Sequence, residues 1–141
     1  MSIEENKALD GRIYEEIWNN KNLGAIDEIY SADVITNNLP PEMPTGIEGL
    51  KQFVAMYLTA FPNPHFHVDD QVGEGDKVVT RWTFHGKHEG ELMGIPATGK
   101  DVTVTGIGVS RIAGGKIVEE WGEFDTMGMM VQLGVVSPPG G

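Results

Sequence analysis

The hydrophobic period of this chain changes once, at Pro62-Asn63-Pro64, and this change constrains the fold more than any other feature. Before it, apolar residues recur at helical spacing, most clearly over Ile47–Phe61. After it, apolar and polar residues alternate, which is typical of strands with one buried face. Helices followed by a run of strands are typical of the α+β class, which we therefore predict.

The first 64 residues predict three helices and one short strand. In the first helix, Glu4–Asn20, apolar residues recur every fourth position beside aromatic neighbours. A short helix over Ala25–Tyr30, a short strand over Asp33–Asn38 and the helix over Ile47–Phe61 follow. Three prolines make Leu39–Pro44 a loop, because proline fixes φ and lacks a backbone donor.

Four strands are expected after residue 64, and they run over residues 65–72, Lys77–His88, Asp101–Ile112 and Lys116–Asp125. Glycine-rich turns, a loop over Gly90–Lys100 and a short helix over Thr126–Leu133 connect or follow them. Glycines inside the strands predict sharp bending. We therefore expect a strongly curved antiparallel or mixed sheet, wrapped around three N-terminal helices and enclosing a pocket. Residues 1–134 would form a single domain and residues 135–141 a flexible tail.

Composition excludes several functions. The chain has 141 residues, with 10 Lys and Arg against 21 Asp and Glu, so its formal net charge is −11. Such an acidic chain repels nucleic acids and anionic membranes. It has no cysteine, which excludes disulfides, thiolate metal sites and cysteine nucleophiles. No apolar stretch is long enough to span a membrane, and no secretory signal is visible, so we expect a cytoplasmic protein.

Two motifs suggest ligands but fit them poorly. Gly94–Lys100 has the spacing of a phosphate-binding loop, but a strand follows it instead of a helix, so we do not expect a nucleotide. His65, His67 and Asp69 share one face of a strand and could hold a metal. A solvated strand face explains them better, and we predict neither a metal nor a cofactor.

His88 is a candidate acid, base or hydrogen-bond donor. It shares the inward parity of Trp82 and Phe84 and lies at the end of its strand, where a pocket would open. The alternative is a histidine that only caps the strand end by bonding a loop carbonyl. A bulge at Gly86 would reverse the parity.

The last strand carries several acids, of which Glu120 and Asp125 are the candidate catalytic residues. A carboxylate inside an apolar cone has a raised pKa and exchanges protons near neutral pH. The alternative is that most of the acids on this strand face water. The residues expected to line the pocket and contact a substrate are Tyr14, Trp18, Tyr57, Trp82, Phe84, Gly108, Gly122 and Phe124.

Four segments carry a family resemblance: Gly49–Phe53, Gly86–Lys100 with its pattern His-x-Gly-x-Leu-x-Gly-Ile-Pro-x-Thr-Gly, Arg111–Trp121, and Gln132-Leu133-Gly134. With them the chain resembles the SnoaL-like polyketide cyclases, in the cone-shaped fold group of ketosteroid isomerase and nuclear transport factor 2. The resemblance implies a deep apolar pocket, cofactor-free chemistry and a homodimer or larger oligomer. It also implies an acidic residue on the last strand that acts as acid and base in the aldol closure of a polyketide ester.

The chain departs from the family at two positions. The family's catalytic aspartate falls on Gly122, and its assisting histidine falls near Gly108. Glu120, Asp125 and His88 then remain as candidates for acid/base chemistry. Our first hypothesis is a cofactor-independent enzyme that catalyses aldol cyclisation, isomerisation or hydration of a small apolar substrate. The alternatives are a non-catalytic module that binds a hydrophobic ligand and an oligomerisation module.

Overall fold

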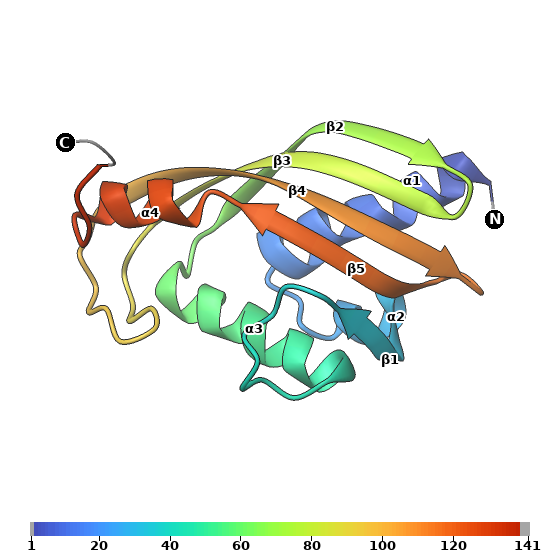
Figure 1. The fold of residues 1–141 in the computed structure, drawn as a ribbon, viewed down its shortest axis with the longest axis horizontal. Coiled ribbons are helices and arrows are strands. Elements are labelled where there is room, and N and C mark those ends of the chain that lie inside the picture. Colours follow the sequence, from blue (N-terminus) through green and yellow to red (C-terminus); the bar gives the residue numbers. More distant parts are fainter. Residues whose placement is uncertain (1, 139–141) are drawn as a thin grey trace.

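A computed structural model describes residues 2–138 and has the expected α+β architecture (Figure 1). The helices are α1 (Ile3–Arg12), the π-helix η1 (Ile13–Asn19), α2 (Ala25–Ile29), α3 (Gly46–Ala60) and α4 (Thr126–Leu133). The strands are β1 (Tyr30–Thr36), β2 (His65–Glu74), β3 (Lys77–Lys87), β4 (Asp101–Ala113) and β5 (Lys116–Phe124). They form one curved sheet in the order β1-β5-β4-β3-β2.

The predicted first helix is a continuous helical segment with two geometries. A capping box between Ser2 and Glu5 starts α1. At Ile13 the hydrogen bonding changes to the wider π pattern, in which the Asn20 amide donates to the Glu15 carbonyl at 3.0 Å. Such π segments are rare and are frequent at functional sites. Here the π-helix carries two aromatic residues of the cavity described below.

The sequence placed Tyr30 at the end of a helix, and this was wrong. Tyr30 is the first residue of β1, which runs parallel to β5, with Tyr30 opposite Ile117 and Thr36 opposite Glu120. The remaining neighbouring strands are antiparallel. The predicted curved, mixed sheet is confirmed, and β1 closes its edge beside the last strand.

Glycine shapes the inner face of the sheet at Gly106. This residue lies between Trp82 of β3 and Phe124 of β5 in the strand register. A Cβ atom at Gly106 would overlap the Trp82 indole, so glycine is needed for the indole to lie flat against the sheet.

Two groups of buried apolar residues hold the helices on the sheet. One joins α1, η1 and α2 to β1 and includes Ile17, Ile26 and Ile29. The other joins the end of α3 to α4 and includes Phe61 and Met129.

Within residues 2–138, no helix has the length and apolar character needed to cross a membrane. The predicted tail at 135–141 lies partly outside the described residues.

Candidate active site

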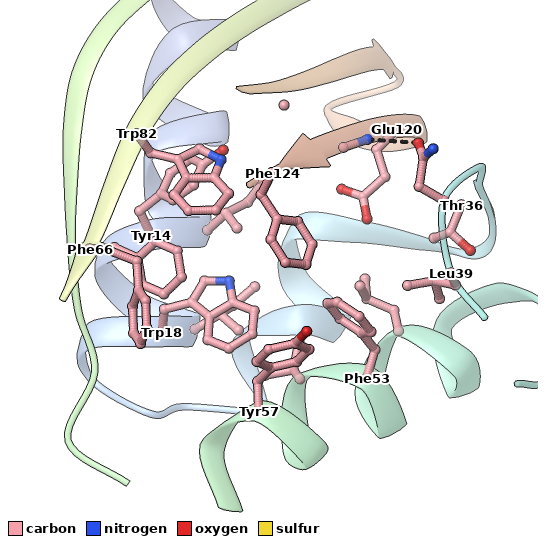
Figure 2. Close-up of a pocket in the computed structure, with 18 of the residues that line it drawn as sticks. Tyr14, Trp18, Thr36, Leu39, Phe53, Tyr57, Phe66, Trp82, Glu120 and Phe124 are labelled. Atoms are coloured by element: carbon pink, nitrogen blue, oxygen red, sulfur yellow. Dashed lines mark hydrogen bonds between the residues drawn. The ribbon is translucent and has the colours of Figure 1, made fainter. Parts of the chain in front are cut away.

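A cavity lies between the inner face of the sheet and the helices η1 and α3, and its volume is about 170 Å³. It is lined mainly by aromatic side chains, most of which lie across the cavity from Glu120 (Figure 2). All eight residues expected to contact a substrate line it: Tyr14, Trp18, Tyr57, Trp82, Phe84, Gly108, Gly122 and Phe124. The volume is below the roughly 300–1,000 Å³ of pockets for drug-sized ligands, so a small ligand or one end of a longer ligand fits.

Glu120 is the only carboxylate among the described residues that line this cavity, and no Lys, Arg or His lines it. Its carboxyl group lies at one end of the cavity, while Trp18, Phe66 and Trp82 lie at the other (Figure 2). The Tyr30 hydroxyl donates to Glu120 Oε2 at 2.9 Å. Oε1 has no hydrogen bond to any described residue, so it is free to meet a ligand.

The surroundings of Glu120 change its acidity. Burial raises its pKa from the ordinary 4.5 to about 7, and the negative charge of Asp10 acts in the same direction. The hydrogen bond from Tyr30 favours the charged form and opposes the rise. The group can therefore both take and return a proton near neutral pH, as a general acid/base needs to do.

The sequence analysis missed Asp10, which is only 1% exposed. Its two carboxyl oxygens accept hydrogen bonds from Thr80 Oγ1 and Ser110 Oγ, each at 2.5 Å. A signal was present, because Asp10 lies three, four and seven residues before Ile13, Tyr14 and Ile17 and so belongs to the buried face of the helix. An acid in that position is expected to be buried.

His88 does not line the cavity, contrary to expectation. It is fully buried beyond the end of β3, with its ring 5.5 Å from that of Phe61. Its Nδ1 accepts from the Thr98 amide at 3.2 Å and lies 3.1 Å from the Thr98 hydroxyl. His88 and Thr98 therefore hold the long loop between β3 and β4 in place. This role is close to the alternative in which His88 only caps the strand end, although its partners are the amide and hydroxyl of Thr98 and not a carbonyl group.

Asp125 does not face the cavity either. It is exposed and caps α4, where its side chain accepts from the Gly128 amide at 2.8 Å. This is the usual arrangement of an aspartate at a helix N-terminus. Of the three candidate acid/base residues, only Glu120 therefore lies at the cavity.

Gly122 and Gly108, where the sequence analysis expects the family's acid and histidine, differ in the space around them. A Cβ atom at Gly122 would meet nothing within 4 Å. A Cβ atom at Gly108 would lie 3.2 Å from the Tyr14 hydroxyl, so a larger side chain there would displace Tyr14. Position 122 can therefore accept an aspartate, while position 108 is already occupied by a neighbouring phenol.

The loop after β1 borders the cavity and is tied to β5 by two asparagines. Asn37 Nδ2 donates to the Glu120 carbonyl at 2.9 Å, and Asn38 Oδ1 accepts from the Gly122 amide at 2.9 Å. Leu39 follows and lines the cavity (Figure 2). The asparagines thereby continue the pairing of β1 with β5 beyond the end of the strand.

A family model described as SnoaL-like polyketide cyclase matches residues 10–133. The chain belongs to this family. A comparison with curated proteins finds no match. The family assignment expected from the loop and hairpin motifs is thus confirmed.

Solved structures of similar proteins agree with the assignment to the SnoaL-like family. TsrD from Streptomyces laurentii is 28% identical, with a TM-score of 0.88 over 96% of this chain and 99% of that one. IdmH from Streptomyces antibioticus, described as a putative polyketide cyclase, is 31% identical, with a TM-score of 0.79 over 92% and 99%. AclR from Streptomyces galilaeus, described as a putative hydroxylase, is 28% identical, with a TM-score of 0.86 over 97% and 85%.

Proposed function

We propose that this SnoaL-like protein is a cofactor-independent acid/base enzyme that acts on a small apolar, polyketide-like substrate. The observation that carries the proposal is Glu120, a lone carboxyl group at the end of an aromatic cavity with a pKa of about 7. An apolar cavity with one ionisable group suits an uncharged ligand that exchanges a proton with that group.

The proposed chemistry is a proton transfer at carbon. Ionised Glu120 takes a proton from a carbon next to a carbonyl group through Oε1, and the electron pair of the C–H bond moves onto the carbonyl oxygen as an enolate. In a cyclisation, the enolate carbon then attacks a second carbonyl of the same substrate, and the new alkoxide takes the proton back from Glu120. In an isomerisation, the proton returns to a different carbon. A positioned acid/base group contributes about 10²–10⁴-fold to such a step.

Glu120 would replace the aspartate that the family resemblance places at Gly122. Residues two apart on a strand face the same side, and both residues line the cavity. The longer glutamate side chain can reach into the space left open above Gly122. On this proposal, the acid lies two residues earlier on β5 than the family pattern places it.

The test is hydrogen–deuterium exchange at the acidic carbon of 2-tetralone, a small uncharged ketone, followed by NMR in D₂O. We expect Glu120→Gln to lower the catalysed exchange rate by about 10²-fold or more. The matched control is Glu123→Gln, because Glu123 is on the same strand but exposed and outside the cavity lining. Equal rates for the Glu120→Gln variant and the original chain would overturn the proposal.

A second candidate function is a binding module without catalysis. Glycine at both positions of the family's acid and histidine favours it. In that case 2-tetralone would quench the fluorescence of Trp18 and Trp82, but no exchange above the buffer rate would occur. Gly122→Asp, for which the structure has room, would then create the missing exchange activity without weakening binding.

We also propose that two copies of the chain associate through the outer face of the sheet. Four residues that are neighbours in the strand register form an apolar row there: Val72, Val79, Val109 and Trp121. Val72 and Val79 are 59% and 37% exposed. Exposed apolar rows of this kind mark association surfaces. Light scattering should report a dimer that Val79→Lys converts to a monomer, and an unchanged mass for this variant would contradict the proposal.

A further inference from the structure

We infer that Asp10, which does not line the cavity, is a positioning residue whose buried negative charge, held by the Thr80 and Ser110 hydroxyl groups, sets the protonation state of Glu120. The inference concerns the same site as the proposed function and depends on it for its catalytic meaning. The protonation of Glu120 can nevertheless be measured without any activity.

The first observation is the environment of Asp10. Its carboxyl group is buried between α1 and the sheet, and each of its oxygens accepts one hydroxyl group, from Thr80 and from Ser110. Thr80 in turn accepts from Gln71 Nε2 at 3.2 Å. No Lys, Arg or His pairs with Asp10 within the described part of the chain. The site therefore holds an acid with hydroxyl partners but no counter-charge.

The second observation is the link from Asp10 to Glu120. Ser110, which donates to Asp10, lies directly opposite Glu120 in the β4–β5 register. Side chains of such opposed residues lie on the same face, with Cβ atoms about 5 Å apart. Ser110 and Glu120 both line the cavity. Ser110 therefore bonds Asp10 and shares a face of the sheet with Glu120.

The third observation is the set of other groups around this pair. The titratable side chains that line the cavity beside Glu120 are tyrosines: Tyr14 from η1, Tyr30 from β1 and Tyr57 from α3. Burial raises the pKa of each of them, so they are neutral donors at neutral pH. The inward side chains of β3 and β4 near the pair, Thr80 and Ser110, do not titrate. Lys77, Arg81 and Arg111 occupy register positions on the outer face.

Two carboxylates in one desolvated region without a cation do not both ionise easily, because each charge opposes the other. They titrate as a coupled pair. Asp10 has two short hydroxyl donors, while Glu120 has one, so Asp10 is the better holder of the first negative charge. Glu120 then keeps its proton until the pH approaches neutrality. An asparagine at position 10 would bond the same hydroxyl groups but carry no charge. If this substitution changes the titration of Glu120, the charge of Asp10 is responsible and not its hydrogen bonds alone.

The test measures the titration of the Glu120 carboxyl carbon by ¹³C NMR of protein labelled in glutamate, with Glu120→Gln to assign the signal. We expect Asp10→Asn to lower the titration midpoint of Glu120 by about 0.5–1 pH unit, because the opposing charge is gone. Asp101→Asn is the matched control, since Asp101 is exposed on β4 and changes the net charge equally. The control should leave the midpoint unchanged.

A second variant keeps the proposal testable if Asp10→Asn does not fold. Thr80→Val retains Asp10 but removes one of its two donors, so Asp10 ionises less readily and the Glu120 midpoint should fall by a smaller amount. An unchanged midpoint in the folded variants would overturn the inference and leave Asp10 as a structural residue. If the midpoint falls but 2-tetralone exchange is absent, the inference stands and the proposed enzyme function fails.

Discussion

Glu120 has its chemistry because of its neighbours. Tyr30 holds one carboxyl oxygen, while the other faces aromatic side chains that provide no hydrogen bonds. Burial and the hydrogen bond from Tyr30 act in opposite directions on the pKa of Glu120. A change in Tyr30 or in the aromatic lining should therefore move the pKa of Glu120 without any change in Glu120 itself.

The first prediction concerns Tyr30→Phe. The Tyr30 hydroxyl stabilises the ionised form of Glu120, so its removal should raise the Glu120 titration midpoint by about one pH unit. The measurement is the same ¹³C NMR titration. Tyr57→Phe is the control, because Tyr57 lines the cavity but has no hydrogen bond to Glu120. A midpoint that stays constant or falls in Tyr30→Phe would contradict the geometry.

Alternation along β5 puts Glu120 on the same face as Gly122 and Phe124, because residues two apart on a strand point to the same side, but the sequence left open which acid faces the pocket. Alternation failed for His88, which stands just outside β3, and it did not decide the direction of Asp125, which stands just outside β5. Beyond a strand end, the direction of a side chain depends on local contacts. His88 follows its bonds to Thr98, and Asp125 follows the first turn of α4.

At the scale of elements, the loop between β1 and α3 depends on Gly49. A Cβ atom at this buried residue of α3 would overlap the carbonyl oxygen of Pro44 and touch Leu39. The proline-rich loop can thus lie directly on the helix only where a side chain is missing. Leu39, which lines the cavity, is held in place by this contact.

The second prediction is that Gly49→Ala lowers the free energy of unfolding by about 1–3 kcal/mol, because the loop must move away from the helix. It should also weaken 2-tetralone binding, since Leu39 moves with the loop. Urea unfolding and fluorescence quenching provide the two measurements. Gly122→Ala is the control, because a Cβ atom there has open space. Equal stability of the two variants would show that the loop does not depend on this contact.

At the scale of the whole molecule, the buried acids oppose folding as the pH rises. The pKa of Asp10 and that of Glu120 are both higher in the folded chain than their ordinary values, chiefly because of burial. A raised folded pKa means that the folded state binds protons more tightly than the unfolded state. The stabilising effect of such an acid is complete at low pH and is lost as the pH rises through its pKa in the folded chain.

The third prediction is therefore a loss of stability between about pH 4.5 and pH 7, in which Glu120 accounts for on the order of 3 kcal/mol. Acids with a lowered pKa, such as Asp69 and Glu119, act below this range and do not cancel the loss. Urea unfolding at several pH values measures the effect. Glu120→Gln should flatten the curve over this range, whereas Glu123→Gln should leave it unchanged. A curve that rises from pH 5 to pH 7 would contradict the buried state of these acids.

The sequence by itself determined the class of fold, most of the helices, the long strands and the family. These follow from periodicity and short motifs, which depend on residues close together in the chain. Only the tertiary structure decided which acid faces the cavity and what surrounds it. Tyr30 and Glu120 are 90 residues apart and Asp10 and Ser110 are 100 residues apart. Such contacts depend on strand register and helix packing, so the pKa of a buried acid is a property of the folded chain.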